Sequence, residues 1–214
     1  MVLGLDTCLS ACSVAVLDGE TVLAHASETM ARGHQERLAP MAQAVMAQAG
    51  IGFDRLQRIG ATVGPGSFTG LRVGVAFAKG LGSALGVPAV GVGSLEALAA
   101  EASGMVAAAI DARRDQLYLQ VFEDGQPLMA PDVLPVGTAA ARLAELAMGR
   151  ALTLVGSGAP LLADAAPGAH ILTPDGCDAR AVARLAAAKP AAPMRPLYLR
   201  APDAKLPGGI DPWS

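Results

Sequence analysis

Short runs of apolar residues open the chain, and their spacing is typical of β-strands. Residues 2–7 and 12–17 are two such runs, separated by a short polar turn. Asp18 and Gly19 come next, and because both residue types tolerate positive φ, they suit a two-residue hairpin turn before a third run at 21–26. The beginning of the sequence therefore predicts an antiparallel meander of three strands.

After this meander the apolar residues recur every three or four positions, as expected for an amphipathic helix. The segment from Gln35 to Ala49 shows this period, and Gly50 follows it as a stop signal. Strands and helices then alternate, which is the order of an α/β fold. We expect a strand at 58–63, a glycine-rich loop at 64–70, a helix at 71–85, a strand at 89–92 and a helix at 94–102.

The opening pattern returns later in the chain. Ile110–Asp111 repeats Leu5–Asp6 at the end of an apolar run, and Asp124–Gly125 repeats the first hairpin turn. The strand and glycine turn at 62–67 also have a counterpart at 154–159, although no comparable helix follows the second copy. The sequence therefore predicts an α/β protein of two related βββαβα lobes, with the second lobe reduced. We assign residues 1–103 to the first lobe, 104–200 to the second and 201–214 to an extended tail.

Composition limits the class of protein further. Hydrophobic residues make up 52% of the chain and charged residues 16%, which is typical of a folded globular protein. The net charge is -3 and no long basic run occurs, so the chain lacks the electrostatic pattern of a protein that binds nucleic acid alone. If RNA is involved, we therefore expect another molecule to hold it.

Cysteine spacing and the N-terminal sequence indicate a cellular compartment. Cys8, Cys12 and Cys177 form no CxxC pair, which argues against a disulfide framework and a zinc site. The N-terminus lacks the basic segment of a signal peptide, and Pro88 interrupts the least polar stretch, at 80–95. The sequence predicts a cytoplasmic protein with no membrane contact.

An acidic residue ends the first strand of each meander, an arrangement that resembles the actin, sugar kinase and Hsp70 superfamily. The two halves of those proteins close on a nucleotide, so Asp6, Thr7 and Asp111 are candidates for a vestigial nucleotide cleft. The alternative is that each carboxylate bonds only to the backbone of its own turn. The likeness concerns the fold and does not establish an activity.

A glycine-rich segment follows a strand and opens a helix, so its backbone N–H groups could bind an anion. Its spacing matches neither a P-loop, nor a dinucleotide fingerprint, nor the G-x-S-x-G turn of hydrolases. The alternative is that the glycines let the backbone turn sharply beneath a packed helix. The signature residues are Gly64, Pro65, Gly66, Ser67, Phe68, Thr69, Gly70 and Arg72.

Small residues recur every four positions along the helix expected at 71–85. Each interior glycine costs a helix about 1 kcal/mol relative to alanine, so close approach to another backbone must compensate. That backbone belongs either to the chain's own sheet or to a partner helix, and the pattern leaves both open. The candidate partner-interface residues are Gly70, Gly74, Ala78 and Gly82 of this stripe and Leu38, Met41 and Val45 of the preceding helix.

The histidines offer no metal site, because His25, His34 and His170 stand alone and no His-x-x-x-His pair occurs. We expect neither a metal nor a cofactor. His34 precedes a helix, and we expect it to act there as a polar cap. Arg113 and Arg114 fill the turn of the second meander, where we expect solvated loop charge.

Several sequence blocks occur in the order and at the spacing of the bacterial TsaB (YeaZ) family, and they extend over residues 1–200. The nonapeptide Gly64–Arg72, with the sequence Gly-Pro-Gly-Ser-Phe-Thr-Gly-Leu-Arg, is highly specific. The chain therefore resembles a member of this family. The other blocks are Gly4–Thr7, Cys12–Ala15, Arg32–Leu38, Gly80–Leu81, Ser94–Leu98, Ile110–Arg114 and Pro196–Arg200.

The resemblance implies a two-lobed, actin-like protein that acts with a catalytic paralogue, TsaD, and an ATPase, TsaE. Together they place threonylcarbamoyl on the adenosine beside the anticodon of tRNA. The resemblance also points to the N-terminal helices as the surface that meets the partner or a second copy of the chain. Because this chain lacks the His-x-x-x-His segment of TsaD, the resemblance implies a non-catalytic subunit. A stand-alone actin-fold kinase or an M22-type peptidase is the alternative interpretation.

Overall fold

The first half of the chain forms a five-stranded sheet. The computed structural model describes residues 1–200, and the tail expected at 201–214 lies outside the described residues. The strand order is β3-β2-β1-β4-β5, in which β1 to β3 form the antiparallel meander while β4 and β5 run parallel to β1. The strands are β1 (Val2–Asp6), β2 (Ala11–Asp18), β3 (Thr21–Thr29), β4 (Arg58–Thr62) and β5 (Ala89–Val92).

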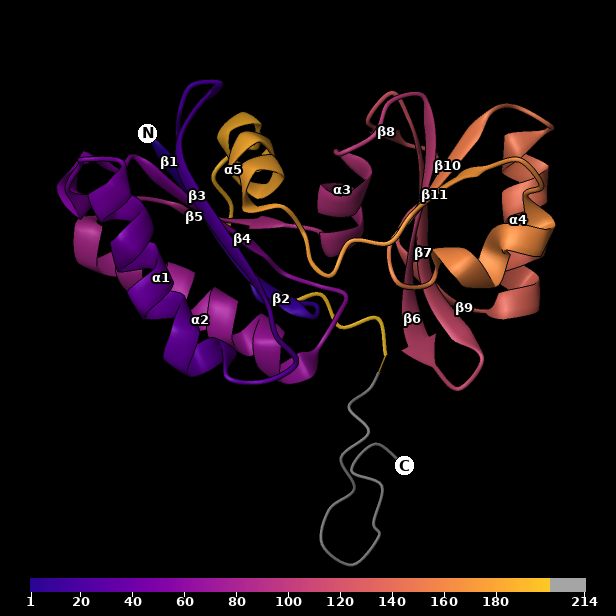
Figure 1. Ribbon diagram of the computed structural model, residues 1–214, viewed down its shortest axis with the longest axis horizontal. Coiled ribbons are helices and arrows are strands. Elements are labelled where there is room, and N and C mark those ends of the chain that lie inside the picture. The colour runs from indigo at the N-terminus through magenta and orange to yellow at the C-terminus, as the bar shows by residue number, and fades with distance from the viewer. Residues whose placement is uncertain (201–214) are drawn as a thin grey trace, which may run out of the picture.

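Two helices, α1 (His34–Gln48) and α2 (Phe68–Leu85), cover one face of this sheet (Figure 1). Helix α2 begins before residue 71, where the sequence predicted its start. The reason is that the Ser67 side chain accepts a hydrogen bond from the Gly70 amide and caps the helix. A 3-10 turn, η1 (Phe53–Arg55), precedes β4, and a short helix, α3 (Ser94–Ala99), follows β5.

The second half repeats the meander in a six-stranded sheet of order β11-β10-β6-β7-β8, and β9 also pairs with β7. The expected hairpin turn is present, with φ of 47° at Asp124 and 77° at Gly125. A helix that the sequence did not predict, α4 (Val136–Ala147), follows the strands, and a 3-10 turn, η2 (Ala159–Ala165), follows β10. The strands are β6 (Met105–Arg113), β7 (Gln116–Glu123), β8 (Gln126–Pro127), β9 (Asp132–Pro135), β10 (Leu152–Val155) and β11 (His170–Leu172).

Helix α5 (Ala179–Ala188) corrects the expected lobe boundaries. The sequence assigned this segment to the second lobe, but the helix packs on β1, β2 and β4 of the first sheet, opposite α1 and α2 (Figure 1). Glycines allow this close contact, because a Cβ added at Gly4 would lie only 2.2 Å from the Ala179 carbonyl oxygen. Helices α3 and α5 therefore form a layer between the two sheets, where Leu98, Ile110 and Val182 share one core.

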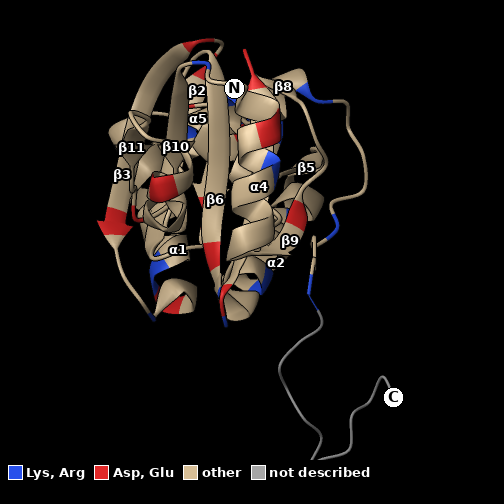
Figure 2. Ribbon diagram, turned by 90° about the vertical axis from the view of Figure 1, so that its right-hand side faces the viewer, with Lys and Arg blue, Asp and Glu red and all other residues tan. Residues whose placement is uncertain are grey.

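Figure 2 shows acidic and basic residues interspersed along the ribbon. The net charge of the chain is -3. Within residues 1–200, no helix combines the length and the hydrophobicity needed to cross a membrane.

Candidate functional site

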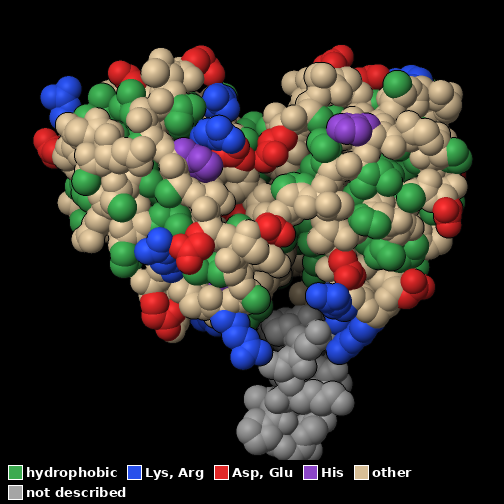
Figure 3. Space-filling view, viewed as in Figure 1, with side chains coloured by type: hydrophobic (Ala, Val, Ile, Leu, Met, Phe, Trp, Pro, Cys, Tyr) green, Lys and Arg blue, Asp and Glu red, His purple; other side chains and the backbone are tan. Residues whose placement is uncertain are grey.

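The two lobes, seen as separate masses in Figure 3, enclose a cavity of about 400 Å³ between the ends of their first strands. This is the place where the sequence predicted a vestigial nucleotide cleft. The first lobe contributes Cys8, Leu9, Ser10, Ala31, His34, Gly66 and Ser67 to its walls, and the second contributes Ile110, Asp111, Ala112, Arg113, Tyr118 and Ser157.

Asp6 does not reach this cavity. Its side chain is fully buried, and Oδ1 accepts hydrogen bonds from the Thr62 hydroxyl at 2.6 Å and the Cys8 amide at 3.0 Å. Oδ2 accepts a third hydrogen bond, from the Cys177 amide at 2.9 Å. Burial raises the pKa of Asp6, whereas these hydrogen bonds and the charge of His34 act to lower it. The prediction that Asp6 lines the cleft is wrong, because Asp6 ties β1 to β4 and to the segment before α5.

Thr7 and the glycine-rich loop pack directly against each other. Thr7 is buried and its hydroxyl donates a hydrogen bond to the Gly70 carbonyl at 2.7 Å. A Cβ added at Gly70 would lie 2.0 Å from the Thr7 carbonyl oxygen, and one at Gly66 would lie 2.4 Å from the Cys8 carbonyl oxygen. The geometry favours the packing alternative for these glycines. Of the other signature residues, Gly64 and Pro65 are buried, and Ser67, Phe68, Thr69 and Arg72 are exposed.

Asp111 lines the cavity, but its carboxylate already has partners. It accepts hydrogen bonds from the backbone amide of Arg113 at 2.8 Å and from the Arg113 guanidinium at 3.1 Å. The Asp111 amide donates to the Ser157 hydroxyl at 3.1 Å. Asp111 therefore both faces the cavity and bonds to its own turn, so it combines the two alternatives that the sequence left open.

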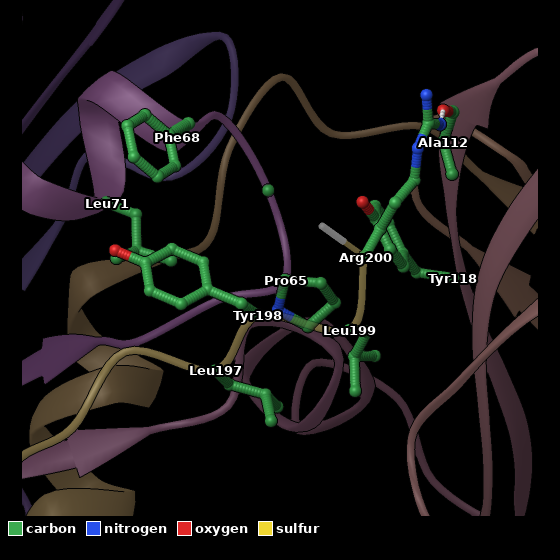
Figure 4. A pocket seen from close by; sticks show the side chains of 10 residues that line it. Pro65, Phe68, Leu71, Ala112, Tyr118, Leu197, Tyr198, Leu199 and Arg200 are labelled. Atoms are coloured by element: carbon green, nitrogen blue, oxygen red, sulfur yellow. Dashed lines mark hydrogen bonds between the residues drawn. The ribbon is translucent and has the colours of Figure 1, made fainter. Parts of the chain in front are cut away.

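The C-terminal part of the described chain docks beside the glycine-rich loop (Figure 4). The ring centroids of Phe68 and Tyr198 are 5.5 Å apart, and the Arg72 guanidinium lies 5.1 Å from the centroid of Phe68. Arg200 reaches the second lobe, where it donates a hydrogen bond to the Ala112 carbonyl at 2.8 Å. The docked segment closes a pocket of about 210 Å³, lined by Pro65, Gly66, Phe68, Leu71, Ala112, Tyr118, Leu197, Tyr198, Leu199 and Arg200.

The buried thiols are held in their protonated form. Burial and the nearby charge of Asp6 raise the pKa of Cys8 to about 12 and that of Cys12 to about 11. Burial also raises the pKa of Cys177. Because the thiolate is the nucleophile, these groups are inert at neutral pH. Within the described part of the chain, no group of three or more His, Cys, Asp or Glu side chains could hold a metal ion.

The predicted partner-interface residues lie inside the first lobe. A Cβ added at Gly74 would lie 2.6 Å from the Thr7 hydroxyl, and one at Gly82 would lie 2.9 Å from the Val87 carbonyl oxygen. The small-residue stripe thus lets α2 approach its own strands, and the prediction that it forms a partner surface is wrong. All of the predicted interface residues are buried: Leu38, Met41, Val45, Gly70, Gly74, Ala78 and Gly82.

His34 is not the helix cap that the sequence suggested. Gly33 occupies the N-cap position of α1 without a side-chain hydrogen bond, and His34 is the first residue of the helix. The His34 side chain is 8% exposed, and its Nε2 has no hydrogen-bond partner among the described residues. This buried polar group was missed because its place before an amphipathic helix is typical of an ordinary cap.

The chain is similar to known proteins along most of its length. The family model described as "TsaD: tRNA N6-adenosine threonylcarbamoyltransferase" matches residues 21–164. An uncharacterized protein of Mycobacterium tuberculosis is 35% identical over 206 residues, which are 95% of this chain and 93% of that protein. The tRNA threonylcarbamoyladenosine biosynthesis protein TsaB of Escherichia coli is 36% identical over 127 residues, which are 57% of this chain and 54% of that protein.

Solved structures support the same assignment. YeaZ from Pseudomonas aeruginosa has a TM-score of 0.76 and 30% identity, covering 87% of this chain and 90% of that one. An ROK hexokinase from Thermus thermophilus has a TM-score of 0.51 and 17% identity, covering 87% and 97%, which shows the fold alone. Two lobes with repeated meanders and an interlobe cavity define an actin-like protein of the class that includes sugar kinases. Within this class, the chain belongs to the TsaB/YeaZ family.

Proposed function

We propose that this chain is a non-catalytic subunit that acts with the catalytic paralogue TsaD and the ATPase TsaE to form N6-threonylcarbamoyladenosine in tRNA. The name of the E. coli relative refers to this biosynthesis. The observation that carries the non-catalytic role is the position of Asp6, whose carboxylate accepts three buried hydrogen bonds. A carboxylate held in this way could bind a metal-bound phosphate only by giving up contacts that hold the lobe together.

We assign the partner-binding surface to the sides of α1 and α2 that face away from the sheet, which we call the α1–α2 outer surface. The sequence of α1 carries no charged residue from 38 to 48, although half of this segment is exposed. Protein interfaces are depleted in charge at their centres, whereas solvated helix faces are normally charged. The exposed residues of this surface include Ala39, Pro40, Gln43, Ala44, Ala47 and Gln48 of α1 and Ala76, Gly80, Ser83 and Ala84 of α2, and α2 also exposes the charged residues Arg72 and Lys79.

Gly80 gives this surface a place where another helix can approach closely. A Cβ added at Gly80 would meet nothing within 4 Å, so the chain's own packing does not require glycine there. An interior glycine still costs the helix about 1 kcal/mol relative to alanine. Contact with a helix of TsaD, or with a second copy of this chain, would compensate for that cost.

The experiment tests binding with TsaD from the same genome. We expect Ala44→Arg and Gly80→Arg each to prevent co-elution in size-exclusion chromatography, because an arginine cannot be accommodated in a close helix contact. Ala141→Arg on α4, where Ala141 is also exposed, is the matched control and should bind as the unaltered chain does. Melting temperatures of all variants should stay near that of the unaltered chain.

The catalytic assignment is tested by reconstitution with tRNA and a threonylcarbamoyl donor. We expect modified adenosine only when TsaD and TsaE are added to this chain. Modification of tRNA by the chain alone would overturn the non-catalytic role. Unchanged co-elution of both arginine variants would overturn the assignment of the α1–α2 outer surface.

A further inference from the structure

A second pocket, which the proposed function does not use, lies between the beginnings of α1 and α2. Its volume is about 360 Å³. His34 lines this pocket and also the cavity between the lobes. The residues that line it are Ala31, Arg32, Gly33, His34, Gln35, Glu36, Ser67, Thr69, Gly70 and Val73.

The first turns of two long helices contribute to this pocket, α1 with 15 residues and α2 with 18. The first backbone N–H groups of a helix have no partner within the helix and carry its partial positive charge. In α2, the Ser67 side chain satisfies only the Gly70 amide. Among the described residues, no acceptor is found for the backbone amides of His34, Gln35 and Thr69, three residues that line the pocket. Two sets of free donors therefore lie at one pocket, an arrangement that favours an anion.

His34 provides an independent indication of a ligand. Its side chain is more than nine-tenths buried, with 8% exposed, and Nε2 has no hydrogen-bond partner among the described residues. Buried polar groups in folded proteins nearly always have a partner, so an orphaned Nε2 on a residue that lines a pocket indicates a missing one.

The side chains at the pocket mouth carry both signs of charge. Arg32 is exposed and adds a positive charge to the lining. Glu36 also lines the pocket, but it is exposed to water and its carboxylate accepts a hydrogen bond from the side-chain amide of Gln35 at 2.8 Å. Solvent screens an exposed carboxylate more strongly than it screens the amides and the buried imidazole.

We infer that this pocket binds a phosphate group, which accepts hydrogen bonds from the first-turn amides of α1 and α2, from Arg32 and from His34. The donors are backbone N–H, guanidinium and imidazole, the set that recognises phosphate oxygens in proteins. The phosphate is either the free inorganic ion or the end of a nucleotide, since a pocket of about 360 Å³ has room for more than one phosphate group.

The test uses the isolated full-length chain, so its outcome is independent of TsaD binding. Isothermal titration calorimetry with inorganic phosphate, ADP and adenosine, each in phosphate-free buffer, measures affinity and stoichiometry. We expect saturable binding of phosphate, ADP or both at one site, and none of adenosine. Binding of phosphate alone identifies the free ion as the ligand, and binding of ADP alone identifies a nucleotide. In a long-range imidazole NMR spectrum, the signals of His34 should shift on binding while those of exposed His170 should not.

Variants separate this site from any other anion site. We expect His34→Gln to weaken binding about tenfold or more, the loss typical of a charge-assisted hydrogen bond. Thr69→Glu places a carboxylate at the exposed start of α2 and should abolish binding, and this variant keeps the test valid if His34→Gln does not fold. His170→Gln is the control and should bind normally. Absence of saturable binding, adenosine binding as tight as ADP binding, or unaltered affinity in both site variants would overturn the inference.

Discussion

Two glycines of α2 provide a direct test of how this helix packs. Gly70 faces the turn after β1, where an added Cβ would lie 2.0 Å from the Thr7 carbonyl oxygen. Gly80 lies in the same helix, and an added Cβ would meet nothing within 4 Å. Replacing each with alanine makes the same chemical change in two surroundings. Gly70→Ala and Gly80→Ala should therefore change the free energy of unfolding in opposite directions.

The expected magnitudes follow from two effects. Alanine is favoured over glycine in a helix interior by about 1 kcal/mol, so Gly80→Ala should stabilise the chain by about that amount. At Gly70 a forced contact with a rigid backbone costs about 1–3 kcal/mol or more. The displaced Gly70 carbonyl also loses its hydrogen bond from Thr7, which adds about 1 kcal/mol. After subtraction of the helix preference, Gly70→Ala should destabilise the chain by about 1–3 kcal/mol.

Urea denaturation followed by circular dichroism measures both values, and thermal melting gives a second estimate. For a chain of this length, about 2–4 °C in melting temperature corresponds to each kcal/mol. We expect Gly80→Ala to melt higher than the unaltered chain and Gly70→Ala to melt lower. If Gly70→Ala were as stable as Gly80→Ala, the result would refute our conclusion that the small-residue face of α2 packs on the chain's own strands.

Further predictions concern packing, pH and RNA. Ala78→Arg should unfold the lobe because Ala78 is fully buried, whereas Ala76→Arg on the exposed side should leave the melting temperature nearly unchanged; equal melting temperatures would contradict the packing. Burial raises the pKa of Asp6 above its usual value of 3.8. The protonated Asp6 side chain therefore contributes its full stabilisation below pH 3.8, and this stabilisation is lost as the pH rises through the raised pKa. The stability difference between the unaltered chain and Asp6→Asn, measured by denaturation at several pH values, should therefore shrink as pH rises, and a constant difference would refute this. With a net charge of -3, the isolated chain should show no salt-dependent tRNA binding in filter-binding assays, and tight binding that weakens steeply with salt would reveal an unrecognised basic surface.

Regular apolar periods allowed much of the fold to be predicted. The meander, α1 and the repeated hairpin turn at Asp124 and Gly125 follow from local patterns, and each is present in the structure. Helix α4 (Val136–Ala147) was missed because alanine lies on both its buried and its exposed faces, as Ala139 and Ala141 show. Hydrophobic periodicity depends on contrast between faces, and an alanine-rich helix offers little of it.

The candidate site was harder to predict because its residues act through distant partners. The four-residue period in α2 correctly indicated a close backbone approach, but the sequence did not reveal that the neighbour is Thr7 of the same chain. The strand-end position of Asp6 was equally clear, yet its hydrogen-bond donors at Thr62 and Cys177 come from far along the chain. The sequence therefore identified the small residues of α2 and the Asp6 carboxylate as important positions, and only the tertiary structure shows what they contact.

The return of α5 to the first sheet has a consequence for binding energetics. The chain passes between the lobes after α3, again between β11 and α5, and a third time before Arg200 bonds to Ala112. A rotation of one lobe against the other would have to bend all three connections and disrupt the apolar layer between the sheets. The lobes are thus held in one relative orientation before any partner arrives. Association on such a preorganised subunit loses little conformational entropy, so more of the contact energy is retained as affinity.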